Sequence, residues 1–173
     1  MAWNNYVRPW VNRCIFGCCM FLLTACVSYK FVGVDIPAQA QTVTIKQFQN
    51  NASLVNLKLS NEITTQLRDK FQSNTRLSLV DSRGDLSIEG EITNYALSSV
   101  ALGTDRATMN RLTITIRIKY ENRFEEEKNV EQSFSRYQDF SSSENLQAIE
   151  DRLINEICEA LIDDIFAATV GNW

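Results

Sequence analysis

The chain has 173 residues and a net charge of −4 at pH 7, which is enough length for one domain with its own core. Mild acidity argues against nucleic acid as a partner, because phosphate binding needs a basic surface. The sequence contains no histidine, which removes the usual general base and the commonest metal ligand. We therefore expect no nucleic-acid partner, no metal and no cofactor.

The first 25 residues have the order of an export signal. Arg8 and Arg13 precede a short apolar stretch over residues 14–23, which cannot span a bilayer with polar flanks. The ending Leu-Thr-Ala-Cys26 resembles the lipobox of bacterial lipoproteins, in which the cysteine is acylated and becomes the first residue of the mature chain. We predict a lipoprotein signal peptide over residues 1–25 and lipidation of Cys26 with fatty acids such as palmitate. An ordinary secretory signal or a buried helix is the alternative.

Loss of this leader would remove two basic and no acidic residues, which changes the net charge from −4 to −6. It would also remove three of the five cysteines and leave Cys158 as the only thiol besides that of Cys26. A single thiol forms no internal disulfide, and no cysteine pair remains to bind zinc. Because Cys158 lies in a helical pattern, we interpret it as a small core residue.

Residues 26–41 show little periodicity and are predicted to tether the lipidated end to a single domain over residues 42–173. The domain opens with an alternating segment, residues 42–48, which predicts a short strand with Val43 and Phe48 on opposite sides.

A helical period follows the polar turn at residues 50–53. The residues that recur every four positions are Leu59, Ile63, Leu67 and Phe71. They predict one buried stripe, with Asn56 as the N-cap and Asn74 and Thr75 at the end of the helix.

Two long alternating segments, residues 85–102 and 107–121, predict a β-hairpin with its tip at residues 103–106. A short strand over residues 77–80 precedes them. In the first segment, Leu86, Ile88, Gly90 and Ile92 alternate with a polar row that includes Tyr95. Gly90 is predicted to mark a bulge or a close backbone approach. In the second, Leu112, Ile114, Ile116 and Ile118 face one way.

The last third of the chain predicts a strand and a long helix. Residues 130–140 alternate as a final strand, and Ser141 with Glu144 has the spacing of a capping box. The following apolar stripe contains Leu146, Ile149, Leu153, Ile157, Leu161 and Ile165. Gly171 is the predicted stop of this helix.

These elements predict an α+β fold. Two helices pack on one face of a mixed four- to five-stranded sheet, which makes a two-layer sandwich with a long β-hairpin. The apolar and polar alternation of the strands indicates that one face of the sheet is covered and the other is exposed.

No motif for catalysis occurs in the sequence, which has no Gly-x-Ser-x-Gly elbow, P-loop, dinucleotide fingerprint or Cys-x-x-Cys. The missing histidine further disfavours a small hydrolase. We therefore predict a binding or structural protein and no enzyme.

Five segments, taken in order, resemble the LptE family of lipopolysaccharide-assembly lipoproteins in its Bacteroidetes form. They are NLKLSNEITTQLRDKF (56–71), GDLSIEGEITNY (84–95), NRLTITIRIKY (110–120), FSRYQDF (134–140) and DIFAATVGNW (164–173). They cover nearly the whole chain after the tether, and the lipobox fits the same family. Their joint order, and no single segment, carries the resemblance.

The resemblance implies a plug seated inside the large outer-membrane β-barrel LptD, with which the family delivers lipopolysaccharide to the outer leaflet. It implies roles in barrel assembly, pore occlusion and lipopolysaccharide contact, without turnover of a substrate. We expect an LptD-like barrel, lipopolysaccharide and the membrane as partners, with the protein lipid-anchored at the outer membrane and facing the periplasm and the barrel lumen. The alternative is a generic periplasmic lipoprotein adaptor that binds protein partners.

Basic residues gather around the predicted hairpin, where the chain has no acid between Asp105 and Glu121. The candidates for contact with lipopolysaccharide phosphates are Arg106, Arg111, Arg117 and Lys119. Arginine matches phosphate geometry with two parallel donors. Alternation places Arg117 and Lys119 on one face of their strand. A solvated strand face without a ligand is the alternative interpretation.

Overall fold

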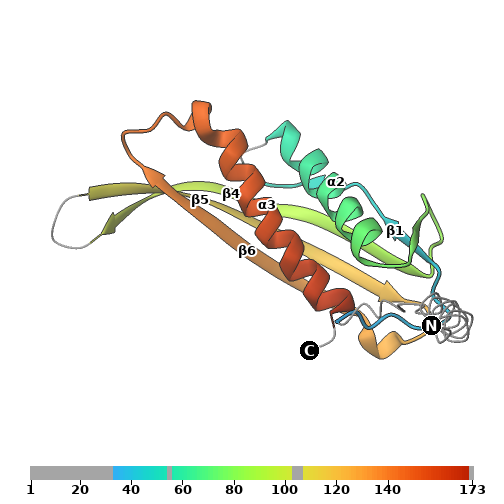
Figure 1. The fold of residues 1–173 in the computed structure, drawn as a ribbon. Coiled ribbons are helices and arrows are strands. Elements are labelled where there is room, and N and C mark those ends of the chain that lie inside the picture. Colours follow the sequence, from blue (N-terminus) through green and yellow to red (C-terminus); the bar gives the residue numbers. More distant parts are fainter. Residues whose placement is uncertain (1–32, 54–55, 103–106, 172–173) are drawn as a thin grey trace, which may run out of the picture. The chain divides into compact units, whose positions relative to one another are not determined.

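The computed structural model describes residues 33–53, 56–102 and 107–171, in which two helices cover one face of a sheet (Figure 1). The helices are α2 (Leu57–Asn74) and α3 (Leu146–Val170). The strands are β1 (Thr42–Ile45), β2 (Gln49–Asn50), β3 (Ser78–Leu79), β4 (Leu86–Leu102), β5 (Ala107–Asn122) and β6 (Val130–Ser141). A 3-10 turn, η2 (Glu126–Lys128), precedes β6. The predicted α+β architecture is confirmed.

The sheet is mixed, in the order β3-β1-β4-β5-β6, with β2 also paired to β4. Pairs among β1, β2, β3 and β4 are parallel, whereas β4, β5 and β6 are antiparallel neighbours. The described residues form six strands, one more than the upper prediction. The strand predicted over residues 42–48 ends at Ile45, and the additional strand, β2, follows at Gln49–Asn50, where the predicted turn begins.

The β4–β5 hairpin extends past both helices at its far end (Figure 1). On one side, the pairing of β2 with β4 ends at Ile92. On the other, β6 pairs with β5 from Tyr120 to Met109. The helices therefore cover only the near part of the hairpin (Figure 1).

The core lies between the two helices and one face of the sheet. The fully buried sheet residues include Leu86, Ile88, Ile92, Leu112, Ile114, Ile116 and Ile118. The helices bury Leu59, Ile63, Leu67, Phe71, Leu153, Ile157, Leu161 and Ile165. The predicted stripe of α2 is thus confirmed as core, and so is that of α3 from Leu153 to Ile165. Leu146 and Ile149, at the start of the predicted α3 stripe, are only partly buried and pack against the core.

Cys158 belongs to this core. Its side chain is fully buried, and burial raises the pKa of the thiol to about 12. A thiol with such a pKa stays protonated at neutral pH, which fits a packing residue and not a nucleophile.

A β-bulge between Ile92 and Asn94 changes the phase of β4. The predicted uniform alternation placed Tyr95 in the polar row, which is wrong. The extra residue, Thr93, turns the following side chains to the other face, so Tyr95 lies opposite Ile114 and is buried.

Gly90 provides a close approach and not the bulge. A side chain at Gly90 would overlap the ring of Phe48. Phe48 was predicted on the side opposite Val43, but both are buried in the core, because β1 ends at Ile45 and regular alternation ends with it.

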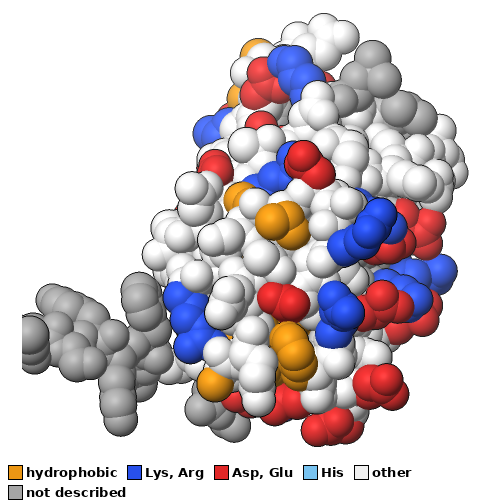
Figure 2. Space-filling model, turned by 90° about the vertical axis from the view of Figure 1, so that its right-hand side faces the viewer, with side chains coloured by type: hydrophobic (Ala, Val, Ile, Leu, Met, Phe, Trp, Pro, Cys, Tyr) orange, Lys and Arg blue, Asp and Glu red, His pale blue; other side chains and the backbone are white. Residues whose placement is uncertain are grey.

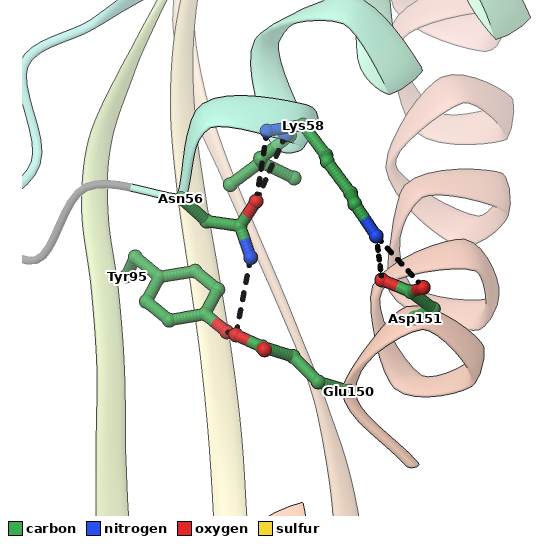
Figure 3. Close-up of polar contacts among 6 residues, drawn as sticks. Asn56, Lys58, Tyr95, Glu150 and Asp151 are labelled. Carbon is green, nitrogen blue, oxygen red and sulfur yellow. Dashed lines mark hydrogen bonds and ion pairs between the residues drawn. The ribbon is translucent and has the colours of Figure 1, made fainter. Parts of the chain in front are cut away.

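A polar junction joins the bulged strand to both helices (Figure 3). Asn56 caps α2 as predicted, and its amide also donates to a Glu150 carboxylate oxygen at 3.1 Å. The Tyr95 hydroxyl donates to the same oxygen, and burial raises the pKa of Tyr95 above its usual value. Lys58 forms an ion pair with Asp151 at 3.0 Å. These contacts fix the start of α2 against the first turns of α3.

The start of α3 differs from the prediction. Its N-cap is Asn145, whose side chain accepts a hydrogen bond from the backbone N–H of Gln147 at 3.0 Å. Ser141 is instead the last residue of β6, and its N–H donates to the Glu144 carboxylate at 3.0 Å. The capping-box spacing therefore closes the turn before the helix. Gly171 follows the last turn of α3, as predicted.

Part of the predicted tether contacts the body. Val34 forms a β-bridge with Gly171, and Asp35 forms an ion pair with Lys128 at 2.6 Å. Pro37 and Ala40 are buried. The chain is therefore held against the end of α3 from about Val34 onward.

We expect Leu67→Ala and Ile157→Ala each to lower the free energy of unfolding by about 2–5 kcal/mol, because each leaves a cavity in the core between helix and sheet. Thr65→Ala, at an exposed position of α2, is the control and should change it by less than about 0.5 kcal/mol. Denaturant unfolding followed by circular dichroism measures all three. Wild-type stability in both core variants would show that the assigned helix faces are incorrect.

Candidate functional site

The side of β4, β5 and β6 that points away from the helices is here called the helix-free face. Strand register and alternating burial define its members. They include Ser87, Glu89, Glu91, Asn94 and Ala96 from β4; Arg111, Thr113, Thr115, Arg117, Lys119 and Glu121 from β5; and Glu131, Ser133, Ser135, Tyr137 and Asp139 from β6. The face is therefore rich in hydroxyl and charged groups.

Three of the four basic residues predicted from the sequence lie on the helix-free face. Arg111, Arg117 and Lys119 all belong to β5 and occupy alternate positions of that strand. Arg106 lies outside the described residues, as does Cys26, the predicted lipidation site.

Each of these three basic side chains has an acidic partner. Arg111 pairs with Asp139 at 2.7 Å, Arg117 with Glu91 at 3.2 Å and Lys119 with Glu121 at 2.7 Å. Sequence reasoning missed the first two partners because Asp139 and Glu91 are distant in the chain and come from neighbouring strands. Only the cross-strand register brings them together.

Arg117 and Lys119 are the more accessible cations. Their side chains are 54% and 58% exposed. They line a surface hollow of about 230 Å³ with Lys46, Glu89 and Glu131. Exposed ion pairs contribute only about 0–1 kcal/mol, so an anionic ligand can compete with the carboxylates for these side chains.

Arg111 is held more firmly. Its guanidinium donates two parallel hydrogen bonds to Asp139, at 2.7 and 2.8 Å, and both side chains are only 29% exposed. This pairing raises the pKa of Arg111 and lowers that of Asp139. The guanidinium carbon also lies 3.6 Å from the centre of the Tyr137 ring.

Charges of both signs are interspersed on the side of the molecule seen in Figure 2. Other cations of the body also lie beside carboxylates, as Lys70 does beside Asp163 and Arg136 beside Asp164. The described surface in this view therefore shows no broad area of one sign that would attract a polyanion by net charge alone.

Two kinds of feature are absent from the described part of the chain. No cluster of three cysteine, aspartate or glutamate side chains there could hold a metal ion. No helix there is both long enough and apolar enough to cross a bilayer.

Comparison with protein families places the chain. The model of the family described as LptE, lipopolysaccharide-assembly, matches residues 40–169. This chain belongs to the LptE family. Members of this family are non-enzymatic lipoproteins of lipopolysaccharide assembly that associate with the outer membrane. The family resemblance inferred from the five sequence segments is thereby confirmed.

One solved structure shows the same kind of fold at low identity, and a second is less similar. A putative neuraminyllactose-binding hemagglutinin homolog from Helicobacter pylori has a TM-score of 0.52 and 10% identity, over 80% of this chain and 87% of that one. A minor lipoprotein from Acinetobacter baumannii has a TM-score of 0.47 and 14% identity, over 77% and 98%. At such identities the likeness concerns the fold alone. A search of curated protein sequences gives no match.

Proposed function

We propose that this LptE-family lipoprotein is anchored at the outer membrane by acyl chains on Cys26, occupies the lumen of an LptD-like β-barrel and contacts lipopolysaccharide through its helix-free face. The observation that carries the proposal is the family match over residues 40–169. We divide the chain accordingly into a signal peptide (1–25), a tether (26–41) and one domain (42–173).

The surface of the body supports residence in a barrel lumen. The interior of a large outer-membrane barrel is polar, whereas its outer wall faces lipid. Among the described residues the exposed large hydrophobic side chains are Leu97, Phe124 and Tyr137. A body with so little exposed apolar surface suits a polar lumen better than the lipid phase.

Arg117 and Lys119 are proposed to contact phosphates of lipopolysaccharide. Exposed ion pairs contribute only about 0–1 kcal/mol, and a phosphate accepts charge-assisted hydrogen bonds as a carboxylate does. A phosphate can therefore replace Glu91 or Glu121 as partner. For Arg106 and Arg111, contact with phosphate stays a prediction from the sequence.

The proposed anchor follows from acyl-chain energetics. Each buried CH₂ contributes about 0.8 kcal/mol, and one acyl chain alone gives only marginal membrane binding. Several chains on Cys26 would hold the protein at the membrane without a spanning helix. Val27 follows Cys26 and is not an acidic retention signal, so we expect the inner leaflet of the outer membrane.

Affinity purification of the tagged full chain from solubilised outer membranes tests the plug role. We expect a large β-barrel protein to copurify in equal amount, because a plug is enclosed by its barrel. The Cys26→Ser variant should remain unprocessed and without lipid, and should be missing from the outer-membrane fraction.

Recovery of soluble periplasmic proteins alone would contradict the plug role and favour the adaptor. A mature N-terminus at another residue, without lipid, would contradict the anchor.

The double variant Arg117→Glu, Lys119→Glu tests the phosphate contacts. We expect lipopolysaccharide affinity to fall roughly tenfold or more at low salt, and the difference to shrink at high salt because exposed charges are screened. The matched control is Lys58→Glu, Arg152→Glu, which reverses two exposed, ion-paired cations on the helices.

Affinity for purified lipopolysaccharide is measured at two salt concentrations, with circular dichroism to verify the fold. Equal losses in both double variants would indicate an effect of net charge alone, and an unchanged affinity in the first would exclude its two residues as contacts.

A further inference from the structure

Tyr137 is the most exposed of the large hydrophobic side chains among the described residues, at 53%. It lies in the second half of β6, on the helix-free face. Exposure of the apolar surface of an aromatic ring to water is unfavourable, and no neighbouring side chain covers this part of the ring. The ring is thus available to a ligand.

The ring is also held in place before any ligand binds. Arg111 lies against one side of it, with 3.6 Å between the guanidinium carbon and the ring centre. Asp139 fixes this guanidinium with its two hydrogen bonds. Little conformational freedom remains to be lost on binding, and the exposed area belongs to the part of the ring that Arg111 does not cover.

The neighbours of Tyr137 are polar or small. Thr113 lies directly opposite it on β5, with Ala96 beyond on β4. The hydroxyls of Thr115 and Ser135 hydrogen-bond to each other at 2.9 Å in the adjacent row. The ring is therefore not part of an apolar patch, which argues against an acyl chain or a hydrophobic protein partner at this position.

The charge around the ring is balanced, because the guanidinium of Arg111 already pairs with a carboxylate. A phosphate would have to displace Asp139 from its two-point contact, whereas a neutral group would not. One flat aromatic surface bordered by hydroxyl, carboxylate and guanidinium groups fits a ligand with an apolar ring face and hydroxyls at its rim. A pyranose has this chemistry.

We propose that Tyr137, with Arg111 and Asp139, forms a stacking platform for a pyranose ring of a saccharide. Thr113, the residue opposite Tyr137, lies four positions from Arg117 on β5, a distance of about 14 Å. One face of the sheet thus offers a sugar platform and, beside it, exposed cations. The assignment of the sugar to lipopolysaccharide rests on the proposed function; the platform itself does not.

The test uses the full-length lipoprotein in detergent and titrates it with two probes. One is the core oligosaccharide that mild acid releases from lipopolysaccharide, and the other is the N-acetylglucosamine–N-acetylmuramic acid disaccharide of peptidoglycan. We expect Tyr137→Ala to lower the affinity for the bound probe roughly tenfold or more, and Tyr137→Phe and Tyr137→Trp to retain it. Phe124→Ala removes a similarly exposed aromatic ring away from the helix-free face and should have no effect.

Because stacking is not a charge interaction, the loss of affinity caused by Tyr137→Ala should change little with salt. Preference for the core oligosaccharide ties the platform to lipopolysaccharide, and preference for the disaccharide ties it to peptidoglycan. Unchanged affinity in Tyr137→Ala, or failure of the wild type to bind either probe, overturns the proposal. Copurification with a barrel is measured separately, so the platform can fail while the plug role stands, and the reverse.

Discussion

Burial of one face of the β4–β5 hairpin is the constraint on which the rest of the structure depends. Its strands carry isoleucine and leucine at alternate positions, and complete burial of each such side chain stabilises the fold by about 1.5–3 kcal/mol. Each helix buries its stripe against this side of the sheet and against the other helix, where Phe71 of α2 meets Phe166 of α3 edge to face. Both helices therefore lie on the same side, and the other side is left to polar residues.

The division between the two faces is maintained by local devices. The bulge at Thr93 turns Tyr95 toward the helices, where it reaches Glu150 and, through it, the cap of α2 (Figure 3). On the helix-free face, ion pairs across strands satisfy charges that would otherwise repel like neighbours. The helix-free face is therefore polar, and ion pairs hold its charged side chains in place. Such a surface suits contact with a charged glycolipid.

Much of the fold could be predicted from the sequence, because period and burial agree along most of the chain. Leu67 and Ile157 belong to apolar stripes whose spacing of three and four residues indicates a helix. Asn56 is recognisable as an N-cap because its side chain can accept hydrogen bonds from the first backbone N–H groups of α2. The burial of Phe48 and Tyr95 could not be predicted in this way. A break or bulge of a single residue moves the side chains of the residues that follow to the other face of the sheet. The sequence pattern does not indicate where such a break or bulge occurs.

The candidate site was predictable only in part. The strand pattern located Arg117 and Lys119 on one face, but the pairing of Arg117 with Glu91 depends on the register between β4 and β5. The Tyr137 platform depends on the position of Arg111 across the strand pair, 26 residues earlier in the chain. The choice of Asn145 over Ser141 as cap depended on how far β6 continues before the helix begins.

The central claim is that the helix-free face, and not the helix layer, meets lipopolysaccharide. A photo-crosslinking amino acid at Ser133, which lies opposite Arg117, tests it most directly in living cells. The same amino acid at Thr65, exposed on α2, reports on the other side. We expect a lipopolysaccharide adduct from position 133 and none from position 65. An adduct from position 65 alone would contradict it.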